Sequence, residues 1–471
     1  MFMAAFVAEA QFNYTTNNGS ITITRYTGSD GIVTVPAIID GFPVTTIGGS
    51  AFESTSVGSV VLPNSITNIL YEAFIYCAKL TNVTVPSSVI EIQNFAFLGC
   101  PLLADIAVDS HNAFYSSVDG VLFDKDQTTL LQCPETKTGT YTIPDTVSSI
   151  GSEAFYGCGS LTNVMLGRLV SSVSTGGGDM FFNCTNLVAI TVNTNNDFYS
   201  DIGGVLFTKN RSTVVLYPWG RAGAYTIPAG TTSIGYSAFY YRQSLAGVTM
   251  PASLTNISDG AFGSCGALAA FTVDGNNPVF SSNDGVLFDK TQSTLLLFPP
   301  AHPSPSYTIP NSIKNVHDNA FIACENLKSV TIGESVTNIG SYAFGYCNNV
   351  TAFFFLGNPP GANPEAFHGD TSATAYYLPG MTGWTSTYDG LPTAPGTFPY
   401  PAILNSGLRA GEFSLTVSWL TNVSVVVEGA ATLVNPVWQP LQTNVPSNGT
   451  FEFSDPNWTH YPKRFYRART P

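Results

Sequence analysis

The sequence predicts a solenoid: a stack of short, mostly β coils that follow one another along the chain. The first observation is a phenylalanine that follows a small or apolar residue at ten regularly spaced positions. The second is their spacing, because six of the nine intervals are 22, 23 or 26 residues and the other three are 58, 58 and 59. Units this short cannot bury an apolar face alone, so neighbouring units must stack. The ten positions are Phe52, Phe74, Phe97, Phe155, Phe181, Phe239, Phe262, Phe321, Phe344 and Phe367.

Most units follow the phrase L-x-x-V-x-V-P-x-S-V-x-x-I-x-x-x-A-F-x-x-C, which residues 80–100 illustrate. The first six residues alternate apolar side chains with threonine and asparagine, which predicts a half-buried strand. Pro86 ends that strand because it has no backbone N–H to donate. Ile92 is expected to be a second inward anchor. The A-F-x-x-C run predicts a short helical turn, whose small alanine lets Phe97 fill the core.

Seven of the eight cysteines stand three residues after a periodic phenylalanine. One cysteine per coil at one repeat position predicts a buried ladder of small apolar groups. Disulfides between neighbouring coils, such as Cys77 with Cys100, remain an alternative, because the total is even and secreted proteins form them. A metal site is disfavoured, since no pair has C-x₂-C spacing. Cys133 lies outside the ladder, which comprises Cys77, Cys100, Cys158, Cys184, Cys265, Cys324 and Cys347.

The three long intervals contain an insertion that itself recurs. Residues 114–133, 198–217 and 279–298 share a Gly-Val-Leu-Phe run after Asp or Gly, followed by a polar loop and a second apolar run. Short apolar runs around such turns predict a β-hairpin. We place the complete insertions near residues 109–140, 193–224 and 274–306, and each returns to the coil at Tyr-Thr-Ile-Pro.

The periodic region is expected to span residues 46–391, with other elements at both ends. Residues 1–10 are apolar and end in Ala-Glu-Ala, which predicts a signal-peptide remnant, with a disordered apolar N-terminus as the alternative. Residues 11–45 predict a β-rich cap over the first coil. Residues 392–402 predict a proline-rich linker. Residues 403–471 lose the period and predict a small all-β, sandwich-like domain.

Aromatic and basic residues of the C-terminal domain each have two interpretations. Trp438, Trp458 and Tyr461 could stack on a sugar, but in so small a domain we expect them to fill the core. The basic residues could contact an anionic envelope polymer, but we expect them to balance nearby acids. They are Lys463, Arg464, Arg467 and Arg469.

Composition limits the compartment and the partners. Only 10% of the residues are charged, and the net charge is −14. Residues 1–402 contain 27 acids and 12 bases, and residues 403–471 contain 4 acids and 5 bases. This acidic body argues against a nucleic-acid partner, because phosphate binding needs clustered Lys and Arg. No stretch of about 20 apolar residues predicts a transmembrane helix.

Motifs for catalysis and cofactor binding are missing from the sequence. The five histidines form no metal-ligand spacing, and no nucleophile elbow, phosphate loop or dinucleotide motif occurs. Aspartates recur in two of the insertions, which leaves weak calcium binding as a minor alternative to turn formation. We therefore expect neither an enzyme nor a cofactor. The aspartates are Asp119, Asp124, Asp126, Asp284 and Asp289.

The recurring phrase V-T-I-P…I-G-x-x-A-F-x-x-C resembles the BspA-like bacterial leucine-rich repeats over roughly residues 30–370. The resemblance implies a leucine-rich-repeat solenoid on a secreted or cell-surface bacterial protein. It also implies binding to proteins or surfaces, often in adhesion. The chain departs from the phrase at Met180, at Arg242 and in the glycine-rich segment 171–179.

The outward side chains of the repeat strands are the candidate binding surface. They are mostly neutral, and threonine favours strands in any case, so a solvated face without function is the plain alternative. We expect a protein or surface-polysaccharide partner, with a self-associating envelope component as the second hypothesis and a polysaccharide-active protein as a remote third. The candidate residues are Thr84, Thr191, Thr249, Thr272, Thr331 and Phe354.

Overall fold

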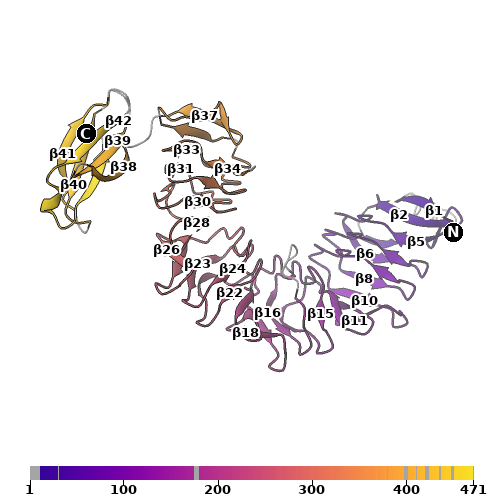
Figure 1. Ribbon diagram of the computed structural model, residues 1–471. Coiled ribbons are helices and arrows are strands. Elements are labelled where there is room, and N and C mark those ends of the chain that lie inside the picture. Colours follow the sequence, from indigo (N-terminus) through magenta and orange to yellow (C-terminus); the bar gives the residue numbers. More distant parts are fainter. Residues whose placement is uncertain are drawn as a thin grey trace. The chain divides into compact units, whose positions relative to one another are not determined.

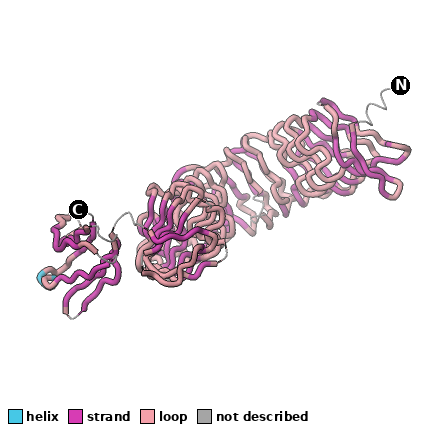
Figure 2. The backbone as a smooth tube through the Cα atoms, turned by 90° about the horizontal axis from the view of Figure 1, so that it is seen from above, coloured by secondary structure: helices cyan, strands magenta, loops and turns pink. Residues whose placement is uncertain are grey.

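The computed structural model describes residues 11–29, 31–173, 180–363, 365–370, 372–378, 380–396, 401–409, 411–419, 424–433, 436–446 and 450–469. Strands and turns dominate these residues, and their helix is confined to the short 3-10 segment η1 (Trp458–His460) (Figure 2). The chain divides into two compact units, Met1–Ala267 and Leu268–Pro471. The predicted signal-peptide remnant and most of the glycine-rich segment lie outside the described residues.

In the first unit, the valine-rich strands of successive coils pair in parallel (Figure 1). The register keeps equivalent residues side by side, because Val60 lies beside Val83 and Val83 beside Ile106. Apolar side chains therefore stack on the inner face, as the alternating pattern predicts. These strands are β3 (Gly31–Thr34), β6 (Val57–Val61), β8 (Asn82–Val85), β10 (Asp105–Val108), β14 (Gly139–Thr142), β16 (Leu161–Leu166), β17 (Ala189–Val192), β21 (Gly223–Thr226) and β23 (Leu245–Met250).

Shorter strands form a second ladder at the predicted isoleucine anchor. Ile47, Ile69 and Ile92 lie in register on neighbouring strands of this ladder. At its N-terminal end an antiparallel hairpin forms the edge, in the segment where a cap is expected. The strands are β1 (Phe12–Asn17), β2 (Ser20–Tyr26), β4 (Ile38–Ile39), β5 (Phe42–Ile47), β7 (Asn68–Ile69) and β9 (Glu91–Ile92).

The A-F-x-x-C run does not form the predicted helical turn, so that prediction is wrong. Glu72 and Tyr76, two residues before and after Phe74, have φ of 59° and 57°. The same pair of left-handed residues recurs around the other periodic phenylalanines wherever both positions are described. A helix needs consecutive right-handed residues, so this alternation prevents one. It turns the N–H groups toward the next coil instead, and the N–H of Phe74 donates to the carbonyl of Ala96 at 2.8 Å.

The insertions are hairpins, as predicted, and each one is also a coil of the stack. Asp119 and Gly120 form the first hairpin turn, with φ of 49° and 76°, the signs of a type I′ turn. A Cβ on Gly120 would lie 2.8 Å from the carbonyl oxygen of Ala104, so this position requires glycine. The third strand then pairs in parallel with the next coil, where Leu130 lies beside Ile150. The insertion therefore supplies its own layer to the core.

Each insertion contributes three consecutive antiparallel strands, and short strands of the following coils continue the same sheet. The first set is β11 (Tyr115–Val118), β12 (Val121–Asp124), β13 (Thr129–Gln132) and β15 (Ser149–Ile150). The second is β18 (Tyr199–Ile202), β19 (Val205–Thr208), β20 (Thr213–Leu216), β22 (Ser233–Ile234) and β24 (Asn256–Ile257). The third, in the second unit, is β26 (Phe280–Asn283), β27 (Val286–Asp289), β28 (Thr294–Leu297), β30 (Asn315–Val316), β32 (Asn338–Ile339) and β34 (Gly361–Ala362).

The periodic phenylalanines pack ring on ring in the core. The ring centroids of Phe52 and Phe74 are 4.8 Å apart, and those of Phe74 and Phe97 are 5.5 Å apart. Tyr217, the last residue of the second insertion repeat, lies 5.1 Å from Phe239 and fills the same place. Each such pair adds roughly 0.5–1.5 kcal/mol to the burial of its rings. Aromatic stacking therefore stabilises the coil-to-coil contact beyond simple burial.

The second unit continues the coil pattern and ends in an antiparallel domain. The strands of its coils that lie outside the sheet of the third insertion are β25 (Ala270–Val273), β29 (Ser306–Thr308), β31 (Ser329–Ile332), β33 (Ala352–Phe355), β35 (Thr374–Tyr377), β36 (Thr387–Tyr388) and β37 (Leu391–Pro395). Because β37 pairs with β35, residues 392–395 belong to the sheet and not to the predicted linker. Residues 397–400 of that linker lie outside the described residues.

The C-terminal domain contains two three-stranded antiparallel sheets. Leu415, Val417 and Trp419 form its core with Phe453. The predicted core position of Trp438, Trp458 and Tyr461 is wrong: the two tryptophans are half-buried and Tyr461 is 41% exposed. One sheet is β38 (Ala402–Arg409), β39 (Glu412–Ser418) and β42 (Thr450–Asp455); the other is β41 (Gln439–Asn444), β40 (Val425–Ala430) and β43 (Phe465–Arg469).

Three of the four basic residues in this prediction, Arg464, Arg467 and Arg469, lie beside acids as expected, and Lys463 forms none of these pairs. Arg467 and Arg469 reach the buried Glu428 at 2.7 and 2.8 Å, and Arg464 lies 2.8 Å from Asp455. Burial opposes the ionisation of Glu428, but hydrogen bonds from the two arginines outweigh it and lower the pKa of Glu428. The buried carboxylate is therefore held as an ion by its partners.

Candidate binding surface

The outward face of the long parallel strands is set by strict alternation. In β8, Val83 and Val85 are buried, while Asn82 and Thr84 are exposed. Because the strands are parallel and in register, outward positions of one coil lie beside those of the next, about 4.8 Å away. The face is therefore a ribbon of mostly uncharged side chains, in which Asp105 lies beside Asn82 as a charged one.

The first unit contains three of the predicted surface residues. Thr84 is exposed, whereas Thr191 and Thr249 are half-buried. Thr84 pairs with Ala107, Thr191 with Met165 and Thr249 with Thr226, so the three predicted threonines do not touch one another. They mark separate places on one kind of surface.

The second unit contains the other three predicted residues. Thr272 is exposed, but Thr331 is only 5% exposed. Thr331 and Phe354 lie side by side in register on β31 and β33. Phe354 is half-buried and stacks on Tyr376 with the ring centroids 5.6 Å apart. The face thus changes from polar to aromatic toward the end of this sheet.

Polar side chains on the face hydrogen-bond between coils. The hydroxyl of Ser59 donates to Asn82 Oδ1 at 3.0 Å. Asn163 Nδ2 donates to Thr191 Oγ1 at 3.1 Å. Amide and hydroxyl groups have more donor and acceptor capacity than one such bond uses. The face can therefore hydrogen-bond a partner's peptide groups or sugar hydroxyls at little cost in charge desolvation.

The cysteines have a role that the sequence analysis missed. Each ladder thiol lies under the preceding coil, and most donate to the carbonyl of its periodic phenylalanine. Cys77 Sγ is 3.1 Å from the carbonyl oxygen of Phe52, and Cys184 Sγ is 3.0 Å from that of Phe155. All eight cysteines are buried as thiols, which favours the ladder over the disulfide alternative. Burial raises the pKa of Cys265 to about 12, so its thiol stays protonated and able to donate.

Ionisable residues take the cysteine position at Arg242 and Asp370, and Glu135 lies beside the column of thiols. Arg242 occupies a cysteine position, is fully buried, and donates from Nε to the carbonyl of Tyr217 at 2.6 Å, as a thiol would. Its guanidinium also lies 5.2 Å from the ring centre of Trp219. Burial raises the pKa of Glu135, beside Cys100, to about 7. Burial likewise raises the pKa of Asp370, at the last cysteine position, to about 7.

A buried asparagine ties the first two insertions to the coil below. Asn112 is fully buried, and its Nδ2 donates to the carbonyls of Pro86 and Val89 at 2.8 and 2.9 Å. Its Oδ1 accepts from the N–H groups of Phe114 and Tyr115, both at 2.8 Å. Asn196 repeats this pattern. The signal was present in the sequence, because asparagine stands two residues before the start of each insertion repeat.

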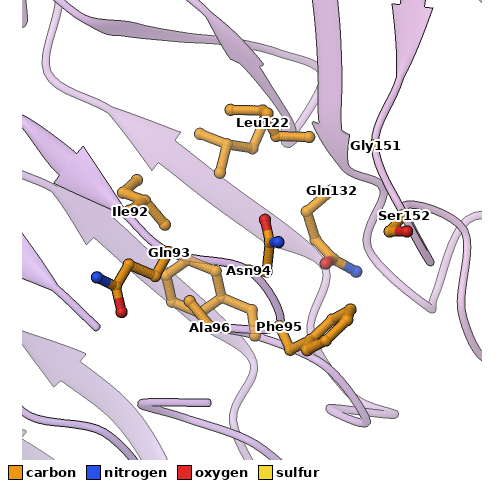
Figure 3. Close-up of a pocket in the computed structure, with 11 residues that line it drawn as sticks. Ile92, Gln93, Asn94, Phe95, Ala96, Leu122, Gln132, Gly151 and Ser152 are labelled. Atoms are coloured by element: carbon orange, nitrogen blue, oxygen red, sulfur yellow. The ribbon is translucent and has the colours of Figure 1, made fainter. Parts of the chain in front are cut away.

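A small cavity marks the ladder break before the first insertion. β9 ends one sheet and β11 begins another, and a space of about 50 Å³ lies between residues 92–97 and residues of β12, β13 and the following coil. Figure 3 shows Asn94 and Gln132 pointing into this space, beside Leu122 and Ser152. A polar cavity of this size suits a few water molecules and not a substrate.

The described residues offer no group of three His, Cys, Asp or Glu placed to hold a metal ion. The insertion aspartates act in turns instead. Asp124 Oδ1 accepts from the N–H groups of Thr128 and Thr129 at 2.7 and 2.9 Å. Asp289 Oδ1 accepts in the same way from the N–H groups of Ser293 and Thr294. This is the turn-forming role that the sequence analysis favours over calcium binding. Among the described residues, no helix has the length and apolarity to cross a membrane.

These features define a leucine-rich-repeat solenoid whose coils repeat the same strand and turn, with a buried thiol at the same position in seven of them. Four segments of the chain match the family described as BspA type Leucine rich repeat region (6 copies). These segments are residues 45–136, 131–216, 222–294 and 301–384. They cover more than half of the 471 residues. The chain therefore belongs to the BspA-type leucine-rich repeat family, which confirms the resemblance and the predicted solenoid.

Several solved structures are similar to the chain. One is a leucine rich cell surface protein from Faecalibacterium prausnitzii A2-165, with 23% identity, 81% of this chain and 92% of that chain covered, and a TM-score of 0.33. A leucine-rich repeat protein from Eubacterium ventriosum ATCC 27560 has 18% identity, 82% and 93% coverage, and a TM-score of 0.42. One from Bacteroides ovatus ATCC 8483 has 18% identity, 81% and 97% coverage, and a TM-score of 0.32. A search among curated proteins finds no match.

Proposed function

We propose that this chain is a non-enzymatic binding protein, secreted or held at the surface of a bacterium, that recognises a macromolecular partner through the outward strand face. The observation that carries the proposal is the repetition of exposed neutral polar positions, such as Asn82 and Thr84, on strands in parallel register. A repeated face of this kind suits an extended partner, either a protein or a surface polysaccharide.

The low charge of the face keeps the energetic cost of removing water on binding small. Binding a partner removes water from both surfaces, and neutral amides and hydroxyls lose less hydration energy than ions do. Repeated small contacts along one partner also add up, because the first contact raises the local concentration of the next. The cell-surface description of one similar structure agrees with the proposed location. The C-terminal domain would then tether or present the repeat region.

A face-directed variant tests the proposal. Thr84→Lys adds a long charged side chain at an exposed position of β8, and Thr15→Lys adds the same charge at an exposed position of β1. Full-length wild-type protein and both variants are used to capture surface extracts, with bound material identified by mass spectrometry. We expect Thr84→Lys to lose the partner that wild type and Thr15→Lys both retain.

Equal capture by all three proteins would refute binding through this face. Capture of the chain's own copies alone, with ordered assemblies by electron microscopy, would favour the self-associating envelope component. Protease treatment of intact cells tests the location separately: a surface protein is digested, whereas an enclosed one is protected.

A further inference from the structure

We propose that the second hairpin insertion contains a binding site for the carboxylate-bearing sugar units of an acidic polysaccharide. A cavity of about 320 Å³ lies there, lined by residues that include Asn193, Tyr199, Asp201, Lys209 and Arg211. Small-ligand pockets are typically about 300–1,000 Å³ in volume. The site goes beyond the proposed function, because it lies in an insertion and does not depend on the outward strand face.

The three insertions share their fold but differ in charge at this place. The loop after the second hairpin strand is Asp-Lys-Asp-Gln at 124–127, Thr-Lys-Asn-Arg at 208–211 and Asp-Lys-Thr-Gln at 289–292. Counting Asp as −1 and Lys or Arg as +1, these loops carry −1, +2 and 0. With Asp201 counted as −1, the residues that line the cavity carry a net +1, so the site is locally cationic in a chain of net charge −14. At physiological salt, charges beyond about 8 Å are screened, so the local loop outweighs the net charge.

Arg211 is the cation that the fold itself does not need. It is exposed and has a left-handed backbone with φ of 62°. The equivalent Gln127 and Gln292 have φ of 55° and 54°, so the same turn forms without a cation. Lys209 has a structural role as well, because its Nζ donates to the carbonyls of Asn196 and, at 3.3 Å, Thr194.

Asp201 gives the cavity an acceptor beside these donors. In the first insertion the hydroxyl of Ser117 accepts from the N–H of Val108 at 3.1 Å. In the second insertion Asp201 stands at this position, and its Oδ1 accepts from the N–H of Val192 at 3.0 Å. Its Oδ2 accepts from the N–H of Gly204 at 3.4 Å. The fold thus fixes a carboxylate at the cavity wall where serine would suffice.

The mixed charges match the chemistry of a uronic acid. A guanidinium binds a carboxylate through two parallel hydrogen bonds, and the nearby ammonium adds to the attraction. A fixed carboxylate accepts hydrogen bonds from hydroxyl groups. Uronic acid units carry both a carboxylate and several hydroxyls, so a short chain of them can supply partners for both Arg211 and Asp201, which line the same cavity. An acidic peptide supplies the carboxylates without the ring hydroxyls.

Calorimetry with full-length protein and a galacturonic acid tetramer tests the site. Arg211→Gln and Asp201→Ser introduce residue types that the other insertions carry at these positions, so both variants should fold. Arg25→Gln removes the same charge from an exposed position on β2 and is the matched control. We expect saturable binding that Arg211→Gln weakens about 10- to 100-fold, the loss of one charged hydrogen-bonded contact. Asp201→Ser also weakens binding, and Arg25→Gln leaves it unchanged.

The methyl ester of the same tetramer has no carboxylates and should not bind. Absence of saturable binding by the acid, or equal binding of the ester, overturns the proposal. An equal loss in Arg211→Gln and Arg25→Gln would show general charge attraction, which also overturns it. If a tetraglutamate peptide binds as tightly and with the same dependence on Arg211, the site takes carboxylates but the sugar assignment fails. Circular dichroism confirms that each variant is folded.

Discussion

Replacing Asn112 by aspartate tests the hydrogen bonds that join the first insertion to the coil below it. The side chain is fully buried and makes four hydrogen bonds of 2.8 to 2.9 Å, two as donor and two as acceptor. A neutral Asp can donate only once, so one carbonyl loses its partner, which costs about 1–3 kcal/mol. An ionised Asp places a negative charge against both carbonyls, so its pKa in the folded protein must rise above the unfolded value of about 3.9.

The sign of the pH dependence follows from this raised pKa. A carboxyl whose pKa is raised by folding is best tolerated below its unfolded pKa, and stability falls as pH rises through the folded pKa. Above the folded pKa, the loss is about 1.36 kcal/mol for every tenfold weakening of the acid by folding. Asn112→Asp should therefore be moderately destabilised at pH 4 and much more so at pH 7.5, relative to wild type at the same pH.

Urea unfolding followed by circular dichroism at the two pH values measures the difference. Asn13→Asp, at an exposed position of β1, controls for the added charge. Hydrogen exchange of peptides that contain Val89 and Tyr115 should show the loss locally. A variant whose midpoint changes equally at pH 4 and pH 7.5 would refute the buried, carbonyl-facing position of this side chain.

Three further predictions concern the core. Phe74→Ala removes a ring packed between two others and should cost about 3–5 kcal/mol; hydrogen exchange should show lost protection in the two neighbouring coils, and a change confined to its own coil would contradict the stack. Glu135→Gln should stabilise the protein above pH 7, because the raised pKa of Glu135 means that its ionisation costs stability as pH rises through about 7; a thermal midpoint that keeps its wild-type pH dependence would argue against this. Arg242→Met leaves the carbonyl of Tyr217 without its donor and should lower stability by about 1–3 kcal/mol, whereas Arg242→Cys should recover part of it; equal losses in denaturant titrations would show that the donor is unimportant.

The repeat period is enough to predict the fold, because spacing is directly visible in a single sequence. Phe74 and Val83 are buried in the core as their pattern predicts, and Ile92 is half-buried and packs against it. The helical turn is wrong for a specific reason: the left-handed conformations of Glu72 and Tyr76 depend on coil-to-coil hydrogen bonds, which local sequence does not reveal. Tertiary context decides such positions for residues other than glycine.

The candidate site is harder to predict than the fold. Alternation identifies Thr84 and Thr272 as exposed, but it also identifies Thr331, which is 5% exposed. Burial of an outward residue depends on what packs over a face, and periodicity contains no information about that. Comparing the three loops for calcium ligands does not reveal the cavity beside Arg211, because that search looks for acidic residues and this cavity is lined by Lys209 and Arg211. A comparison of net charge among the three loops reveals it.

The state of the cysteines tests the stacked core most directly. Full-length protein is unfolded in denaturant without reductant and alkylated, and its intact mass gives the number of reactive thiols. The structure predicts eight adducts after unfolding, and none in the folded protein at the same reagent concentration. Fewer than eight adducts in denaturant would reveal disulfides between coils. Rapid alkylation of the folded protein would show that the thiols do not lie inside the stack.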